Sequence, residues 1–302
     1  MKRIMITGAG GFIGRNLKEY LQDRYPVLGP PHNKLDLLQE NSVRKYIVQN
    51  KVDVIIHCAN VGGGRDTVGK ENVIYENLRM FFNLTRNSNH FEKMIFFGTG
   101  AEYDMRFYKP NMSEDYFDTY IPVDDYGFSK YICSKFIQNS NNIVNLRLFG
   151  VFGKYENCYF KFISNAIVKN IFKMPIIINQ NVHFDYLYID DLTTIVEHFI
   201  NRHNKHKDYN LTRGETIDLL SIANIINEAS QFKSKIIIKN KGLNYKYSGS
   251  NKRLLNELKS FKFTPIRTAI GQLFSWYQQN IDDIDKRKVI KDEYLKYAGV
   301  KN

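Results

Sequence analysis

Short apolar runs alternate with amphipathic stretches through the first half of the chain. The apolar runs have the length and composition of strands buried in a sheet, and the clearest are Arg3–Ile6, Val52–His57, Lys93–Phe97 and Asn141–Phe149. Apolar residues at helical spacing fill the intervals, in Phe12–Arg24, Ser42–Asn50, Asn72–Asn87 and Tyr126–Gln138. This order predicts an α/β fold with a doubly wound parallel sheet.

The pattern is less regular after Phe160. We expect a helix over Phe160–Lys173, a short strand after Pro175 and a helix from Asp190, followed by a mixed basic segment. A chain of 302 residues is long enough for two domains. We predict a first domain over residues 1–168 and a smaller mixed domain over residues 169–302, with the chain crossing back to the first around 184–208.

The composition is that of a folded protein, with 43% hydrophobic and 25% charged residues. No apolar run approaches the roughly 20 residues of a membrane-spanning helix, and the apolar stretch after Arg3 is too short for a secretory leader. Cys58, Cys133 and Cys158 are scattered without CxxC spacing, which predicts neither disulfides nor a metal site. We expect a cytoplasmic protein without a membrane partner.

The formal net charge is +12, and residues 233–302 hold 16 basic against 6 acidic residues. A basic surface attracts phosphorylated small molecules, nucleic acid or anionic membranes. Here the basic residues stand among Leu, Ile and Phe at core-like spacing instead of forming a tail. This favours a solvated surface, a few of whose cations serve a di-anionic substrate, and we expect no nucleic-acid partner.

A glycine-rich segment, Thr7–Gly14 (TGAGGFIG), lies between the first predicted strand and the first predicted helix. Gly8, Gly11 and Gly14 permit a tight turn, a close backbone approach and close helix–sheet packing. The unpaired N–H groups at the helix N-terminus can then bind a pyrophosphate. The segment predicts a dinucleotide site.

The residues near the second strand bear on which dinucleotide binds. Enzymes that use NAD usually place an acid at the end of that strand, on the ribose 2′-hydroxyl. No carboxylate follows Val27–Gly29 directly, whereas Arg15, His32 and Lys34 could meet a 2′-phosphate. We therefore favour NADP(H) and leave NAD(H) open. Asp36, further along, is a candidate adenine contact or a helix cap.

Tyr126 and Lys130 are four residues apart, so they lie on one helix face. A nearby ammonium lowers the pKa of a phenol, which would make Tyr126 a general acid–base near neutral pH. The same spacing occurs at Tyr131 and Lys135, but only Tyr126 follows Thr99, which ends an apolar strand. Ligands of open α/β sheets bind past the carboxyl ends of strands.

Eight segments carry a resemblance to a known family, and they occur in this order along the chain: Thr7–Gly14, Asp36-Leu37, His57-Cys58-Ala59, Asn77, Thr99, Tyr126-x-x-x-Lys130, Leu146–Phe149 and Asp185–Asp191. With these segments the sequence resembles the extended short-chain dehydrogenase/reductase superfamily of nucleotide-sugar epimerases, dehydratases and reductases. The resemblance covers nearly the whole chain. It implies a Rossmann domain, a small C-terminal domain, a nucleotide diphosphate sugar bound between them, and a homodimer.

By position, the resemblance makes Tyr126 the catalytic acid–base, Lys130 a ligand of the nicotinamide ribose, and Thr99 a partner of the reacting sugar oxygen. The implied cofactor-binding residues are Gly8, Gly11, Phe12, Ile13, Gly14, Arg15, Asp36, Leu37, Ala59, Asn77 and Lys130. The implied substrate-binding residues are Thr99, Gly100, Ala101, Tyr126, Lys161 and Arg253. We expect His57 to be structural, and Asp190 and Asp191 to begin a helix.

Several residues typical of related reactions are missing. Sugar 4,6-dehydratases carry two acids after the catalytic Thr, where this chain has Gly100 and Ala101. Reductases that also epimerise use a Cys at the position of Ala101 and a later His, and Gly153–Phe162 contains no His. The reactions that remain open need only the transfer of a hydride and of one proton.

We therefore expect NADPH-dependent reduction of the C4 keto group of a nucleotide-linked 4-keto-6-deoxy hexose or heptose, without epimerisation, in surface polysaccharide biosynthesis. A 4-epimerase with tightly bound NAD stays open, as does a degenerate protein that senses NADP(H) or binds RNA. The usual Asn after the Leu-Arg strand and the usual Arg before Asp185 are absent. Lys161, Lys169 and Arg253 are candidates to replace them in the substrate grip.

Overall fold

A computed structural model describes residues 1–301 and contains a six-stranded sheet in which every neighbouring pair is parallel. The strand order is β10-β5-β4-β3-β1-β2. The bounds are β1 (Ile4–Thr7), β2 (Val27–Leu28), β3 (Val54–His57), β4 (Lys93–Thr99), β5 (Ile143–Leu148) and β10 (Asp208–Leu211). The predicted doubly wound parallel sheet is confirmed.

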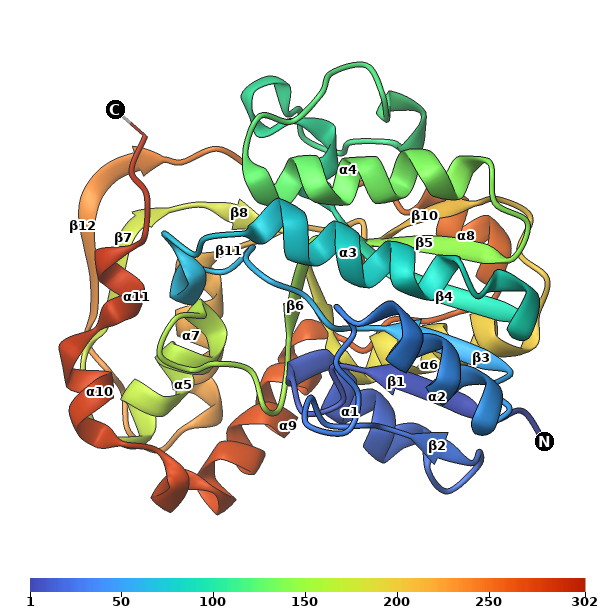
Figure 1. Cartoon of the computed structure of the whole chain (residues 1–302). Coiled ribbons are helices and arrows are strands. Elements are labelled where there is room, and N and C mark those ends of the chain that lie inside the picture. Colours follow the sequence, from blue (N-terminus) through green and yellow to red (C-terminus); the bar gives the residue numbers. More distant parts are fainter. Residues whose placement is uncertain (302) are drawn as a thin grey trace.

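Helices cover both faces of this sheet (Figure 1). One face carries α1 (Phe12–Leu21) and α6 (Ile189–Asn201), and the other carries α2 (Glu40–Gln49), α3 (Val73–Thr85) and α4 (Asp125–Gln138). Successive strand residues point to opposite faces, so Ile4 and Ile6 join the core under α1 and α6 while Met5 joins the core under α2 and α3. The near-continuous apolar strands follow from this double burial.

Two element ends differ from the sequence-based expectation. The first helix ends at Leu21 instead of Arg24, because the backbone N–H groups of Arg24 and Tyr25 both bond to the Leu21 carbonyl and close the last turn. The strand expected to end at Phe97 runs on to Thr99, because Gly98 and Thr99 continue the pairing with β5. The second difference carries Thr99 to the carboxyl edge of the sheet.

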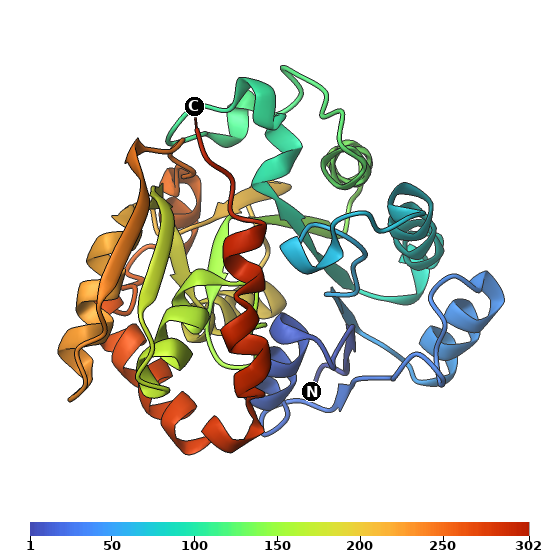
Figure 2. The ribbon, with the colours of Figure 1, turned by 90° about the vertical axis from the view of Figure 1, so that its left-hand side faces the viewer.

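A second part of the molecule packs beside this edge (Figures 1 and 2). Its strands form two-stranded pairs: β7 (Ile176–Asn181) with β12 (Ile236–Leu243), β8 (His183–Phe184) with β11 (Ile217–Asp218), and β6 (Gly150–Phe152) with β9 (Tyr186–Tyr188). Its helices are α5 (Phe162–Ile171), α7 (Leu219–Ala229), α8 (Lys252–Leu258), α9 (Ile266–Gln279), α10 (Lys286–Lys291) and α11 (Glu293–Lys296).

The predicted division after residue 168 falls inside α5 and needs correction. Helix α5 packs against α7, α9 and β7, so it belongs to the second part and the division lies ahead of Phe162. Further along, α6 packs on α1 and β4, and β10 forms the edge of the large sheet beside β5. The chain therefore returns to the first part in and just after the stretch 184–208.

Within residues 1–301, no helix is both long and apolar enough to cross a membrane. Between β4 and α4 the chain forms three short 3-10 turns, Gly100–Tyr103, Met105–Phe107 and Glu114–Tyr116. This segment contacts the second part, because Met112 pairs with the backbone of Ser248 and Ser250. The turns therefore connect the carboxyl end of β4 to the C-terminal half of the chain.

Candidate active site

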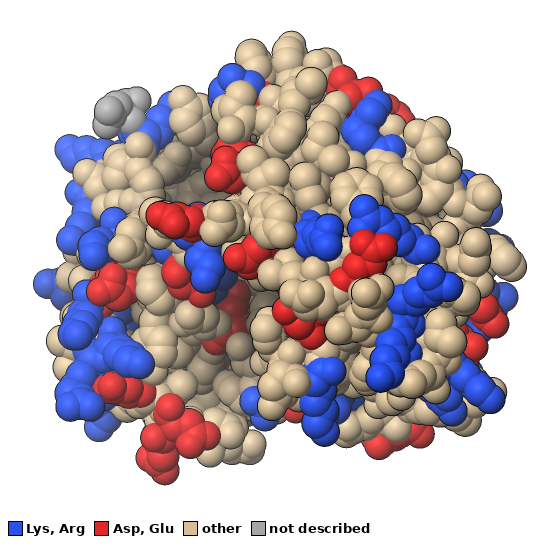
Figure 3. All heavy atoms as spheres, in the orientation of Figure 1, with Lys and Arg blue, Asp and Glu red and all other residues tan. Residues whose placement is uncertain are grey.

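Two hollows adjoin at the carboxyl edge of the sheet, and Figure 3 shows that this face of the molecule is hollowed between its two parts. The first, the central cleft, has a volume of about 620 Å³, and its lining includes Thr99, Tyr126, Lys130, Arg65, Lys161 and Tyr247. The second, the glycine-turn groove, has a volume of about 800 Å³, and its lining includes Gly8, Gly11, Lys18, His32, Asp36 and Ala59. Charged side chains of both signs are interspersed over the face in Figure 3.

The glycine turn brings β1, β3 and α1 into close contact. Gly8 has φ +64°, and a Cβ there would lie 2.7 Å from the Ala59 nitrogen. A Cβ on Gly14 would lie 2.3 Å from the Gly8 carbonyl oxygen. Any side chain at either position would push α1 away from the sheet.

His57 stabilises this turn through the hydroxyl of Thr7. Its Nδ1 lies 2.7 Å from the Thr7 hydroxyl oxygen, which also accepts a hydrogen bond from the Ala59 N–H at 3.2 Å. Complete burial lowers the pKa of His57 to about 3, so the ring is neutral at physiological pH. The structure thus places His57 as a support of the turn.

The residues of the groove fit a dinucleotide. The N-terminus of α1 carries no side-chain cap, so its N–H groups remain available to a pyrophosphate beside Gly11. Asp36, Leu37 and Ala59 line the groove, whereas Phe12 and Ile13 line the adjoining central cleft. A ligand that follows both hollows would run from the β2 side of the sheet to Tyr126.

Arg15 does not occupy the position expected for a 2′-phosphate ligand. Its guanidinium stacks 3.6 Å from the centre of the Tyr155 ring and bonds to Glu19 at 3.3 Å, and it is absent from the groove lining. Lys18 and His32 are the basic residues that line the groove. Sequence reasoning missed Lys18, although it stands one helical turn after Gly14 and so on the same side of α1.

Asn77 acts on the loop that follows β3. Its side chain both accepts from the Val61 N–H at 2.9 Å and donates to the Val61 carbonyl at 2.8 Å, and it lies 3.3 Å from the Ser129 hydroxyl. It lines neither hollow. Asn77, on α3, therefore holds the loop after β3 in place and links it to Ser129 of α4.

Tyr126 and Lys130 both project from the first turns of α4 into the central cleft. The Asp124 carboxylate caps this helix by accepting from the Gly127 N–H at 2.7 Å. The Lys130 ammonium donates to the Phe97 carbonyl at 2.9 Å and lies 5.9 Å from the Tyr126 ring centre. The cap and the carbonyl together fix both side chains.

The Tyr126 phenol is more weakly acidic than expected. Burial raises its pKa to about 12, although the neighbouring Thr99 side chain works in the opposite direction. Burial also lowers the pKa of Lys130. The expected lowering of the Tyr126 pKa by Lys130 is not found, because desolvation raises that pKa and the carboxylates of Glu102 and Asp124 raise it further. The phenol is therefore neutral and can donate a proton.

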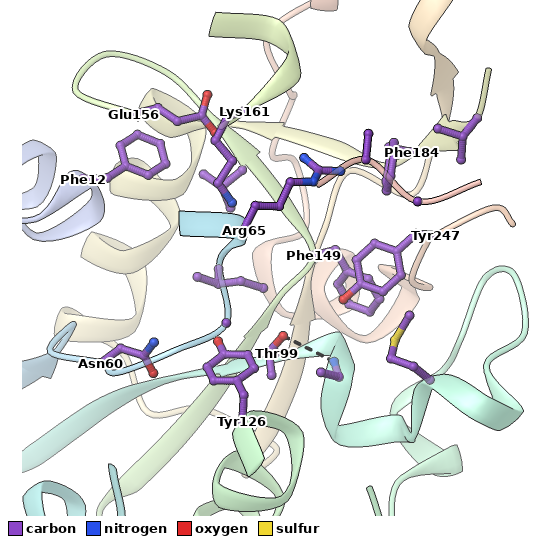
Figure 4. A pocket seen from close by; sticks show the side chains of 18 of the residues that line it. Phe12, Asn60, Arg65, Thr99, Tyr126, Phe149, Glu156, Lys161, Phe184 and Tyr247 are labelled. Carbon is purple, nitrogen blue, oxygen red and sulfur yellow. Dashed lines mark hydrogen bonds between the residues drawn. The ribbon is translucent and has the colours of Figure 1, made fainter. Parts of the chain in front are cut away.

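Thr99 is held at the end of β4 by the residues that follow it. Its N–H donates to the Glu102 carboxylate at 2.9 Å, and its hydroxyl accepts from the Ala101 N–H at 3.3 Å. Figure 4 shows the Thr99 side chain beside the Tyr126 ring. Ala101 lines the cleft. Gly100 is not part of the lining and faces the side chains of Tyr247 and Phe149.

The opposite wall of the cleft carries charges that include two unexpected residues, Arg65 and Glu156. Arg65 comes from the loop after β3 and points across the cleft near Lys161 (Figure 4). Neither cation forms an ion pair within the described part of the chain. Burial raises the pKa of Glu156 to about 7, and its carboxylate accepts from the Ser164 hydroxyl at 2.7 Å.

Arg253 and Lys169, two candidates for the substrate grip, are engaged elsewhere. Arg253 bonds to Asp208 and to Asp115, each at 2.6 Å, and it does not line the central cleft. Lys169 is buried against Asp292 at 2.6 Å. Both expectations are corrected: the cations are committed to ion pairs that join distant parts of the chain.

The carboxylates in the Asp185–Asp191 motif are structural. Asp185 accepts from the backbone N–H groups of Arg213 and Gly214 at 2.9 and 2.8 Å. Asp190 and Asp191 lie in the first turn of α6, where negative charge complements the helix dipole.

Fold and site together define an α/β protein whose glycine-turn groove leads to a cluster of the buried Lys130 and the half-buried Tyr126 and Thr99. The model of the NAD dependent epimerase/dehydratase family matches residues 4–212, and the chain belongs to that family. The resemblance seen in the sequence is thereby confirmed, and a nicotinamide dinucleotide is the cofactor.

Individual relatives are distant but match over most of their length. The chain is 22% identical to the GDP-L-colitose synthase of Yersinia pseudotuberculosis, covering 78% of this chain and 84% of the relative. It is 24% identical to the GDP-6-deoxy-D-talose 4-dehydrogenase of Aggregatibacter actinomycetemcomitans, covering 90% and 97%. The structure of a GDP-mannoheptose C4 reductase from Campylobacter jejuni with NADP bound superposes with a TM-score of 0.79 at 20% identity, covering 92% and 98%.

Proposed function

We propose that the protein is a nucleotide-sugar 4-ketoreductase that reduces the C4 keto group of a nucleotide-linked 4-keto-6-deoxy hexose or heptose without epimerisation. The observation that carries this proposal is the neutral, half-buried Tyr126 beside Thr99, at the point where the glycine-turn groove opens into the central cleft. A GDP-mannoheptose C4 reductase among the structural relatives and a GDP-6-deoxy-D-talose 4-dehydrogenase among the sequence relatives support it.

The reduced nicotinamide dinucleotide supplies the hydride when it is bound. Tyr126 donates its phenolic proton to the oxygen of the C4 carbonyl and is reprotonated from solvent after the product has left. The Thr99 hydroxyl stabilises the negative charge that develops on that oxygen. The Lys130 ammonium, held by the Phe97 carbonyl, would bind the nicotinamide ribose of the cofactor and adds positive charge to the site.

Water is kept from Tyr126 by the loop after β3. Gly63 has φ +82°, and a Cβ on it would lie 2.4 Å from Cζ of the Tyr126 ring, so the backbone itself covers the ring. A substrate that fills the remaining space completes the exclusion. Proton transfer then proceeds within a dry site, where a single hydrogen bond has a larger effect than in water.

Arg65 and Lys161 bind the diphosphate of the substrate in this proposal. Like Lys130, both line the cleft and have no carboxylate partner among residues 1–301, and both point into the cleft (Figure 4). The Lys130 ammonium is held by the Phe97 carbonyl, and Arg65 also donates to the Phe160 carbonyl at 3.2 Å. Arginine offers two parallel N–H donors to a phosphate, and lysine a compact charge. They take the place of the Arg that the sequence lacks before Asp185.

NADP(H) is the proposed form of the cofactor. Lys18 and His32 line the groove at its β2 end, and the residues directly after β2, Gly29 to Pro31, bring no carboxylate there. A 2′-phosphate would meet two potential cations. We also propose, as the sequence suggests, a homodimer that acts in surface polysaccharide biosynthesis.

The deciding experiment incubates the purified protein with NADPH and a panel of GDP-, CDP-, dTDP- and UDP-linked 4-keto-6-deoxy sugars. Nicotinamide oxidation is followed by absorbance, and the product is identified by NMR. We expect stoichiometric oxidation and a product altered only at C4. Copurified NAD⁺ with interconversion of 4-epimers and no net oxidation would instead make the protein an epimerase, and copurified RNA with no turnover would make it a binding protein.

A further inference from the structure

Helix α11 and the residues that follow it pack along β7, at the boundary between the two parts of the molecule (Figure 2). The buried ion pair between Lys169 and Asp292, at 2.6 Å, anchors the N-terminal end of this helix. Tyr294, Ala298 and Gly299 line the central cleft. The stretch 292–301 is called the outer wall of the cleft below.

The segment Ala298–Lys301 is held in place by side chains of other elements. Three of its four residues are exposed, so its own burial contributes little. The Asn179 amide donates to the Ala298 carbonyl at 2.6 Å, and the Asn244 amide donates to the Gly299 carbonyl at 3.0 Å. A segment with few buried contacts depends on such hydrogen bonds for its conformation.

Gln180 bonds to the same segment in both directions. Its side-chain amide donates to the Lys301 carbonyl at 3.2 Å, and its side-chain oxygen accepts from the Lys301 N–H at 2.8 Å. The amide also donates to the Lys241 carbonyl of β12 at 3.0 Å. Because Gln180 is only 6% exposed, water does not readily replace these bonds when the side chain is removed.

The outer wall adjoins the cations that bind the diphosphate in the proposed function. The Arg65 guanidinium lies 4.8 Å from the centre of the Tyr294 ring. The cleft lining also includes the apolar side chains of Val182 and Leu219. A diphosphate carries the sugar on one side and the nucleoside on the other. With the sugar at Tyr126 and the diphosphate at Arg65, the nucleoside extends along the outer wall.

We infer that the outer wall closes the nucleoside end of the cleft, and that Gln180, Asn179 and Asn244 are positioning residues that hold it there. The inference rests on the proposed function, because that function puts a nucleoside diphosphate in the cleft. It also gives the Lys169–Asp292 pair a role, as the anchor of α11. A wall that is ordered in advance lowers the entropic cost of binding, so these residues set nucleotide affinity and not the rate of reduction.

The first test measures the binding of GDP, CDP, dTDP and UDP by calorimetry to the wild type and to Gln180→Met/Asn244→Ala. Methionine keeps the length of the glutamine side chain but forms none of its hydrogen bonds to Lys301. We expect the diphosphate that binds most tightly to bind about tenfold more weakly to the variant. NADPH should bind equally to both proteins, because neither substituted residue lines the glycine-turn groove.

Asn201→Ala is the matched control. It removes an exposed amide that donates to the Tyr25 hydroxyl and lines neither hollow, so both affinities should be unchanged. On the sugar that the panel identifies, Gln180→Met/Asn244→Ala should raise KM about tenfold at nearly constant kcat. A variant with unchanged diphosphate affinity, or with lower kcat at unchanged KM, would overturn the inference.

Hydrogen exchange of residues 292–301, followed by mass spectrometry, reports on the outer wall without turnover. We expect faster exchange in Gln180→Met/Asn244→Ala than in the wild type, and slower exchange in the wild type when the diphosphate is bound. If the wild type binds none of the four diphosphates, the proposed function and this inference fail together. If it binds one and exchange in 292–301 does not change, this inference alone fails.

Discussion

Glu102 and Arg147 form a buried ion pair directly behind Thr99, with Nε of Arg147 2.5 Å from the carboxylate and both side chains at most 1% exposed. The same carboxylate accepts from the Thr99 N–H and from the Ser134 hydroxyl at 2.7 Å. A second carboxylate, that of Asp208, binds the other side of Arg147. The position of the candidate catalytic Thr99 therefore depends on charges that lie outside the cleft.

Glu102→Gln tests this dependence through stability. The substitution keeps the shape of the side chain but removes the charge opposite Arg147, and breaking a buried pair typically costs about 3 kcal/mol. We expect a loss of that size in the free energy of unfolding, measured by urea denaturation. Glu40→Gln, which breaks the exposed pair with Arg86, is the control and should cost less than about 1 kcal/mol. Equal losses in the two variants would contradict the argument.

Tyr126→Phe tests the proton donor. Removal of the phenolic hydroxyl should lower kcat by about 100-fold or more, because general acid catalysis is lost. NADPH affinity, measured by fluorescence titration, should remain within about twofold because the ring is retained. Tyr131→Phe is the matched control, since Tyr131 has the same spacing to a lysine but its hydroxyl bonds to Asp118. Loss of activity in Tyr131→Phe alone would reassign the acid.

The two motifs whose local geometry the sequence predicted lie within short segments of the chain. Thr7–Gly14 and the Tyr126–Lys130 pair each lie within one turn or one helix, so spacing along the chain fixes their geometry. Residues that act through partners far along the chain gave no such signal. The sequence suggests Arg253 and Lys169 as substrate ligands. In the structure Asp208 binds Arg253, and Asp292 binds Lys169.

Arg65, Glu156 and Tyr247 show the same limit. Nothing in their local sequence distinguishes them. They line the same cleft only because the second part of the molecule folds against the carboxyl edge of the sheet. The acidity of Tyr126 was also misjudged, because its burial, which raises the pKa, is a tertiary property. The order of strands and helices needed no such information, since each element shows its own periodicity.

Cofactor selectivity provides a test that separates Lys18 from Arg15. Lys18 lines the groove, whereas Arg15 is held by Tyr155 and Glu19 outside it. We expect Lys18→Ala to weaken NADPH about tenfold relative to NADH, the effect of one charge-assisted hydrogen bond to a phosphate. Arg15→Ala should leave the ratio of the two dissociation constants unchanged. The opposite result would restore Arg15 as the 2′-phosphate ligand.

Glu156 makes stability depend on pH. Its pKa is about 7 in the folded chain against 4.5 for the free side chain, so the folded state holds the proton more tightly between these values. The contribution of Glu156 to the free energy of unfolding is therefore greatest below pH 4.5. It falls as the pH rises to 7, by on the order of 3 kcal/mol. Glu156→Gln should remove this fall when urea denaturation is measured at pH 5 and pH 8. A parallel pH dependence in the variant and the wild type would refute this assignment.

The same carboxyl group should couple substrate binding to proton uptake. Arg65 and Lys161 both lower the pKa of Glu156, and a diphosphate bound to them would cancel that effect and oppose the carboxylate. Binding therefore favours protonated Glu156, and affinity should fall as the pH rises from 6 to 8, by about tenfold. GDP-mannose is a suitable probe because its diphosphate diester does not titrate in this range.

Calorimetry in two buffers with different ionisation enthalpies measures this coupling directly. We expect proton uptake on GDP-mannose binding near pH 7 in the wild type and none in Glu156→Gln, whose affinity should be nearly constant with pH. Arg65→Met should weaken binding and reduce the uptake together, because both arise from one electrostatic contact. Weaker binding with undiminished uptake would place the diphosphate away from Glu156, and so away from the wall formed by Arg65 and Lys161.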